Sequence, residues 1–272
     1  MTRTIERRHA APSRSGLGAA VRSELAKLSW RAPSVAVAAP LAVLIPVLIN
    51  LAIAEAAARN KINGAGGMQT NNVAYWVLMF STFILMAGAV YSTSAEFGNG
   101  TVDLVFARQP RRWLLPVAKA LVFGAIAVVT SAITVAILLF GFPVLYPDIW
   151  GTVDVFSAAG VRILVGVPLH MALITLLGVG LASLVPRPGL VLTLVLLWRF
   201  GVETFVTFVQ GDVGILLQRL APFRNAELGA GQLSTITSLF GGANGSLLYF
   251  AAICVLVFFA GVYRIVGRDV SR

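Results

Sequence analysis

The sequence predicts an all-α polytopic membrane protein, and three observations support this fold class. Of its 272 residues, 58% are hydrophobic and only 12% are charged, which is more apolar side chain than one soluble core can hide. Six apolar runs each approach the roughly 20 residues that a helix needs to cross the hydrocarbon layer. The Arg and Lys residues gather on alternate connections between these runs.

The six predicted spans are separated by polar or glycine-containing connections. We place them at residues 34–54, 73–92, 115–140, 161–185, 190–208 and 247–266. The transmembrane domain therefore covers residues 34–266, followed by a C-terminal segment at 267–272. Kinks are expected at Pro40, Pro46 and Pro168, because a proline inside a helix removes one backbone hydrogen bond.

The distribution of Arg and Lys predicts the orientation of the chain. Fifteen lie on the side of the N-terminal tail and four on the opposite side, so the positive-inside rule places both termini in the cytoplasm. The net charge of +10 is dispersed beside the apolar runs. That pattern fits anionic lipid of the bilayer, whereas nucleic-acid binding, which needs a concentrated basic stripe, is not expected.

The N-terminal segment predicts a disordered cytoplasmic tail over residues 1–16 and an amphipathic interfacial helix over residues 17–33. The apolar stripe of this helix consists of Leu17, Val21, Leu25 and Leu28. Glu24 and Lys27 are expected to turn away from the stripe, and Trp30 to anchor it at the head-group level. A cytosolic helix packed on a partner protein would use the same stripe and remains an alternative.

The connection between the second and third spans carries too many charges to lie in lipid. Thr101 is a candidate N-cap for a short helix that begins at Val102. Val102, Val105 and Phe106 fall at i, i+3 and i+4, which is one apolar stripe, before Pro110 ends the helix. The pattern predicts an amphipathic helix at the membrane surface with its apolar face toward a partner.

The last connection, residues 209–246, is patterned rather than a simple turn. One helical stripe comprises Val213, Leu216, Leu217 and Leu220, and another comprises Leu233, Ile236, Leu239 and Phe240. Pro222 and the glycines of residues 229–231 lie between the stripes. We expect two short helices on the outer side, neither long enough to cross the bilayer.

Charged and polar residues inside the spans are few. Arg199 and Glu203, spaced i, i+4, are expected to meet on one helix face, either as a self-satisfying salt bridge or as part of a substrate path. Arg162 lies at the edge of its span, where snorkelling explains it. His170 is expected to form a hydrogen bond across helices.

Catalytic and metal-binding patterns are absent from the sequence. It has no Walker A, HExxH or Rossmann fingerprint, and with two His and one Cys it offers no Cys-based metal site. Cys254 lies in an apolar run and is expected to be a buried small hydrophobe. A dyad of Ser246 and His170, as in an intramembrane serine protease, is the remaining enzymatic alternative.

The whole pattern resembles the permease subunits of bacterial ABC-2 type transporters. The similarity includes the SELAKL run before the first span, six spans, and an E…GT…P-R…K segment between spans two and three. In this chain the matching residues are Glu96, Gly100, Thr101, Pro110, Arg111 and Lys119.

The resemblance implies that the short helix after the second span is a coupling helix that docks on a separate ATPase subunit. The coupling residues would be Glu96, Gly100, Thr101, Val102, Val105, Phe106, Arg108, Arg111 and Arg112. The chain would not be an enzyme and would bind no cofactor, because ATP and Mg belong to the ATPase. Arg199 and Glu203 match no motif of the family.

The resemblance also implies an exporter in the bacterial plasma membrane, in which this permease pairs with a second copy or a paralogue to enclose the substrate path. An ATP-independent secondary transporter or channel and, less favoured, an intramembrane hydrolase remain the alternative functions.

Overall fold

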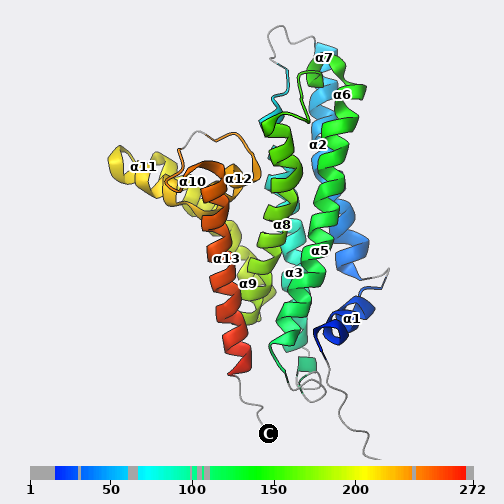
Figure 1. Ribbon diagram of the computed structural model, residues 1–272, viewed down its shortest axis with the longest axis vertical. Helices are drawn as coiled ribbons and strands as arrows, with labels where there is room; N and C mark the ends of the chain where they lie inside the picture. Colours follow the sequence, from blue (N-terminus) through cyan, green and yellow to red (C-terminus); the bar gives the residue numbers. More distant parts are fainter. Residues whose placement is uncertain are drawn as a thin grey trace, which may run out of the picture.

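The computed structural model describes residues 16–29, 32–60, 67–98, 100–102, 106, 111–234 and 237–267. All regular elements within these ranges are helices, and six of them are long and apolar enough to cross a membrane (Figure 1). The six spans are Ser34–Arg59, Thr70–Gly98, Leu114–Leu145, Ala158–Leu184, Pro188–Phe208 and Gly242–Val266. The chain is therefore a multi-pass membrane protein, as its composition predicts.

The spans are built from shorter helical elements, most of which follow one another without a break. The first contains η1 (Ser34–Ala38) and α2 (Ala39–Asn60), and the second contains η2 (Thr70–Asn72), η3 (Val77–Ser81) and α3 (Thr82–Gly98). The third contains α5 (Leu114–Ala136), η4 (Ile137–Gly141) and α6 (Phe142–Leu145), and the fourth is α8 (Ala158–Leu184). The fifth contains α9 (Pro188–Leu196), η5 (Leu197–Val202), α10 (Glu203–Phe205) and η6 (Val206–Phe208), and the sixth is α13 (Gly242–Val266).

Four more helices lie at the two ends of the bundle. Helix α1 (Leu17–Lys27) lies at the end where the chain leaves α13, and α7 (Pro147–Trp150) lies at the opposite end (Figure 1). Helices α11 (Gly211–Leu220) and α12 (Pro222–Ala230) form the connection before α13, and α11 projects sideways from the bundle (Figure 1).

Helix α8 is the centre of the bundle and contacts α3, α5, α12 and α13. In its most apolar stretch 61% of the residues are buried, against 17% in the first and fifth spans, so those two spans expose most of their surface. Glycines bring α8 close to α13. A Cβ added at Gly180 would lie 2.7 Å from Phe258 Cα, and one added at Gly261 would lie 2.6 Å from the Gly180 carbonyl oxygen. Small residues of this kind let membrane helices pack backbone to backbone.

The structure extends some predicted boundaries and shortens one predicted helix. The first span runs to Arg59 rather than residue 54, and the second ends at Gly98 rather than residue 92. The interfacial helix ends at Lys27, before the predicted limit of residue 33. Pro46 and Pro168 lie inside α2 and α8, and the kinks expected at the prolines stay a prediction.

The predicted position of the second short helix before α13, which was based on an apolar stripe, is wrong. The helix is α12, at Pro222–Ala230, whereas the described residues of 233–240 are not helical. Pro222 occupies the first turn, where its missing N–H costs nothing, and Gly231 with φ of 103° ends the helix in the left-handed region. The residues that we expected to separate two helices therefore mark the limits of one.

Candidate functional site

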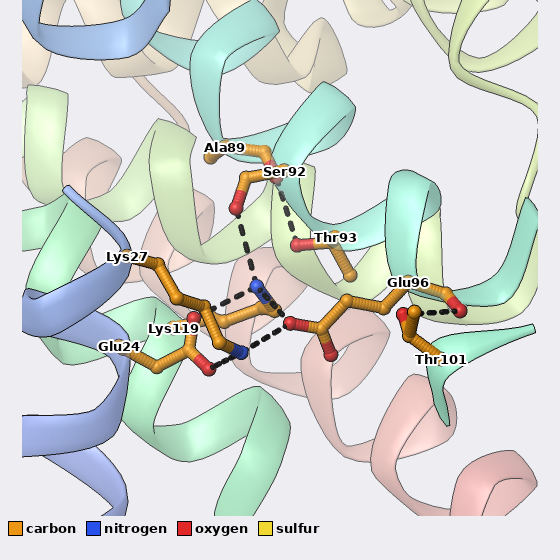
Figure 2. A network of polar contacts seen from close by, with 8 residues as sticks. All are labelled: Glu24, Lys27, Ala89, Ser92, Thr93, Glu96, Thr101 and Lys119. Atoms are coloured by element: carbon orange, nitrogen blue, oxygen red, sulfur yellow. Dashed lines mark hydrogen bonds and ion pairs between the residues drawn. The ribbon is translucent and has the colours of Figure 1, made fainter. Parts of the chain in front are cut away.

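Four charged side chains from three elements meet at the end of the bundle where α1 lies. Glu24 and Lys27 come from α1, Glu96 from the last turn of α3, and Lys119 from the second turn of α5 (Figure 2). We call these four residues the ion cluster. It joins an amphipathic helix to the second and third spans.

Each ammonium group of the ion cluster touches both carboxylates. Lys119 Nζ lies 2.9 Å from Glu24 Oε2 and 3.0 Å from Glu96 Oε1, and it also donates to Ser92 Oγ at 3.1 Å. Lys27 Nζ lies 2.5 Å from Glu24 Oε1 and 2.6 Å from Glu96 Oε1. The two positive and two negative charges balance, which is the condition for burying them together.

The ion cluster is buried most deeply on the side of Lys119. The Lys119 side chain is 1% exposed, those of Glu24 and Glu96 are 5% and 10% exposed, and that of Lys27 is 44% exposed. Burial alone would lower the pKa of Lys27, but its hydrogen bonds to Glu24 and Glu96 outweigh burial, so the pKa is raised. Lys27 therefore stays charged throughout the neutral range.

Apolar contacts next to the ion cluster fix α1 against α5. Ala20 is buried with Leu114 and Ala118, and Val21 packs against this group. One small residue and one carboxylate, Ala20 and Glu24, thus form the inward face of α1. Leu17 and Leu25 of the predicted stripe are exposed, whereas Leu28 is half-buried; Trp30 lies outside the described residues.

The pairing of Glu24 with Lys119 is not predicted by the sequence. Glu24 turns away from Leu17 and Leu25, as expected, but this face of α1 lies against the bundle, where Lys119 offers the carboxylate a buried partner. The ammonium group of Lys119 is held in the ion cluster. The pairing joins residues that are distant in sequence, so no local pattern shows it.

Only part of the predicted coupling segment is described. Gly100 has φ of 67°, and the described residues Thr101, Val102 and Phe106 are helical. The Thr101 hydroxyl donates to the Glu96 carbonyl oxygen at 3.3 Å, and its role as an N-cap stays a prediction. Val105, Arg108 and Pro110 lie outside the described residues.

The two described apolar residues of this segment are covered by the chain itself. Val102 and Phe106 are buried against Leu115 and Ile265, and the Arg112 guanidinium lies over the Phe106 ring at 5.3 Å. The prediction that this face is turned toward a partner is therefore wrong for Val102 and Phe106, whereas Arg111 is exposed.

Arg199 and Glu203 do not form the predicted pair. Arg199 reaches Glu227 of α12 instead, with Nε at 3.0 Å and Nη2 at 2.5 Å from the same oxygen, Oε1. Glu203 accepts from the backbone N–H groups of Phe223 at 2.9 Å and Arg224 at 3.2 Å. It thereby caps the N-terminus of α12, where free N–H groups favour a carboxylate.

His170, Ser246 and Arg162, the other polar residues considered in the sequence, have separate partners. His170 Nε2 and Thr82 Oγ1 are 3.2 Å apart, which confirms the predicted hydrogen bond across helices. Ser246 donates to Ser238 at 2.6 Å, so its hydroxyl hydrogen is not shared with His170. Arg162 donates to the Gly229 carbonyl oxygen at 2.9 Å instead of snorkelling into solvent alone.

Metal-ligating side chains do not cluster anywhere in the part of the chain that the structure describes. Cys254 is buried and free, as predicted. Comparison with protein-family models, curated proteins and solved structures gave no significant match. The resemblance to ABC-2 permeases is thus carried by the motif residues and the topology of this chain.

Proposed function

We propose that the chain is the permease subunit of an ATP-driven ABC-2 type exporter. One observation carries the proposal. The three separate segments on which the resemblance rests, namely the SELAKL run, the Glu96 turn and the Lys119 turn, supply all four residues of the ion cluster. Segments up to 95 residues apart meet at one point, which is what a site that transmits motion between them requires.

The proposed mechanism follows from this connection. The segment that begins after Glu96 would receive motion from a separate ATPase on its polar face. The ion cluster would carry that motion to α1, α3 and α5 as one rigid unit, because each lysine bridges both carboxylates. ATP and Mg would be bound by the ATPase, which is recognisable by a GxxxxGK[ST] motif. A second permease, either a copy or a paralogue, would complete the substrate path.

The orientation belongs to the same proposal. We place α1, the ion cluster and both termini in the cytoplasm of a bacterial cell, because this end of the chain carries most of its Arg and Lys. Helices α7, α11 and α12 would then face outward.

The test uses Glu96→Gln, which removes one charge and preserves the shape of the side chain. In proteoliposomes that contain the permease and its ATPase, this variant is expected to hydrolyse ATP without transport. Glu55→Gln is the matched control, because Glu55 forms an exposed pair with Arg59 at the other end of the bundle. Equal transport by both variants would reject coupling through the ion cluster. Transport without any ATPase would favour the secondary transporter or channel.

A further inference from the structure

Two small polar cavities adjoin at the end of the bundle opposite α1. They have volumes of about 170 and 180 Å³, and Arg199 and Glu227 line both. Arg224 lines the first, and Tyr75, Thr204 and Gln232 line the second. Each cavity is the size of roughly six waters, at about 30 Å³ per water. We call the two cavities together the Arg199 pocket.

The charges of the Arg199 pocket favour an anion. Two guanidinium groups, of Arg199 and Arg224, line it together with one carboxylate, Glu227. Glu203 is nearby, but both of its oxygens accept backbone N–H groups of α12. Among the described residues no carboxylate forms an ion pair with Arg224, whereas Arg199 is paired with Glu227, so the Arg224 guanidinium is available to an anionic ligand. Guanidinium groups match phosphate geometry especially well.

A buried acceptor in the same pocket points to a ligand that also donates. Gln232 is 9% exposed, and its Nε2 donates to Asn72 Oδ1 at 2.7 Å. Its Oε1 is buried and receives no hydrogen bond from the described residues. An unsatisfied buried carbonyl costs free energy, so a donor from a ligand would be stabilising there. The Glu227 carboxylate beside it would favour a positively charged donor.

The helices around the Arg199 pocket place it close to the expected level of lipid head groups. Helix α12 supplies Arg224 and Glu227, and α11 lies next to it, projecting from the bundle (Figure 1). Five apolar residues of α11 are exposed, namely Val213, Ile215, Leu216, Leu217 and Leu220. A helix with such a face lies at the boundary between hydrocarbon and head groups.

We infer that the Arg199 pocket binds a phosphate ester that carries an ammonium group, as in the head group of phosphatidylethanolamine. The phosphate would lie against Arg224 and Arg199, and the ammonium would donate to Gln232 Oε1 and face Glu227. The same chemistry is available from a membrane lipid or from a soluble ester. The inference does not depend on the proposed transport function, because it uses only the end of the bundle away from the ion cluster.

The test compares short-chain phosphatidylethanolamine with phosphatidylcholine of the same chain length. Binding to the full chain in detergent would be measured by native mass spectrometry. The choline head group has no N–H, so it is expected to bind about fivefold or more weakly, by the loss of one hydrogen bond. Gln232→Leu should remove the preference by weakening only phosphatidylethanolamine. Equal affinity of the two lipids for the wild-type chain would overturn the inference.

Arg224→Gln tests the phosphate contact and should weaken phosphatidylethanolamine at least about tenfold, since a charge-assisted hydrogen bond is lost. Arg219→Gln is its matched control, because Arg219 lies on α11 and lines neither cavity. Equal weakening by the two variants would show general charge attraction and overturn the inference. Arg224→Lys keeps the charge and should retain part of the binding. That result would show that the loss of binding in Arg224→Gln is not caused by misfolding.

Glycerophosphoethanolamine added as a competitor identifies the source of the ligand. Displacement of the lipid would show that soluble phosphate esters also bind the Arg199 pocket. Retention of the lipid, with the Arg224 and Gln232 effects intact, would assign the pocket to lipid alone. Failure of both probes to bind would refute the inference and leave the proposed transport function untouched.

Discussion

Removing the Lys119 ammonium group should destabilise the chain more than removing any exposed charge. Lys119→Met keeps the length of the side chain and deletes three contacts, to Glu24, Glu96 and Ser92. Breaking a buried pair by deleting one partner costs about 3–5 kcal/mol, because the other charge stays buried. Lys27 still bridges both carboxylates, so we expect the lower end, about 3 kcal/mol.

The assay is reversible unfolding of the purified chain in dodecyl maltoside by titration with sodium dodecyl sulfate. Arg59→Met is the control, since its pair with Glu55 is exposed and is expected to contribute nothing that the assay resolves. A second variant, Glu24→Gln with Lys119→Met, removes one charge of each sign. It should be more stable than Lys119→Met alone, with a coupling of about 1–3 kcal/mol. The reasoning fails if Lys119→Met and Arg59→Met unfold at the same detergent fraction.

Three further predictions address packing, pH and a buried hydrogen bond. Gly180→Val should force α8 and α13 apart and lower the free energy of unfolding by about 2 kcal/mol or more. Gly189→Val, with no atom within 4 Å of the added Cβ, is the control and should change stability by less than about 0.5 kcal/mol. Similar losses of stability in the two variants would contradict the close helix contact. Because the pKa of Lys27 is raised above 10.5, its contribution to stability should be complete below that pH and disappear as the pH rises through the raised value. Lys27→Gln should lack this alkaline loss, and an unchanged pH profile in the variant would disprove the assignment. Thr82→Val should lower the free energy of unfolding by about 1 kcal/mol, because it removes the hydrogen-bond partner of His170 Nε2. The same unfolding assay measures this change, and a stability equal to that of the wild type would argue against the bond.

The sequence was sufficient for the number of spans and insufficient for the pairing of their charges. Each span is a continuous apolar run, so its existence depends only on local composition. Glu24, by contrast, pairs with a lysine 95 positions away, and nothing local shows that its side of the helix faces inward. Leu25 of the predicted stripe is exposed, and its contact with lipid stays a prediction, while the buried role of the opposite face was missed.

Local rules also failed where two signals competed. Near Pro222, the spacing of Leu233 and Leu239 suggested a helix, but the proline and Gly231 define the actual one. A proline in a first turn starts a helix as readily as it separates two. Glu203 lies at the favoured i, i+4 spacing from Arg199. However, its carboxylate accepts hydrogen bonds from the N–H groups of α12, and Arg199 forms its ion pair with Glu227. Tertiary contacts decided both cases.

The central claim is that this chain works with a separate ATPase through the end of the bundle that holds the ion cluster. Copurification tests it most directly, by isolating the tagged chain from its native membrane in a mild detergent with ATP analogue and Mg. We predict that a protein with a GxxxxGK[ST] motif copurifies in equal amount, and that with Glu96→Gln in the chain the complex hydrolyses ATP without transport. Isolation of a folded chain with no ATPase, and with transport that needs no ATP, would contradict the account.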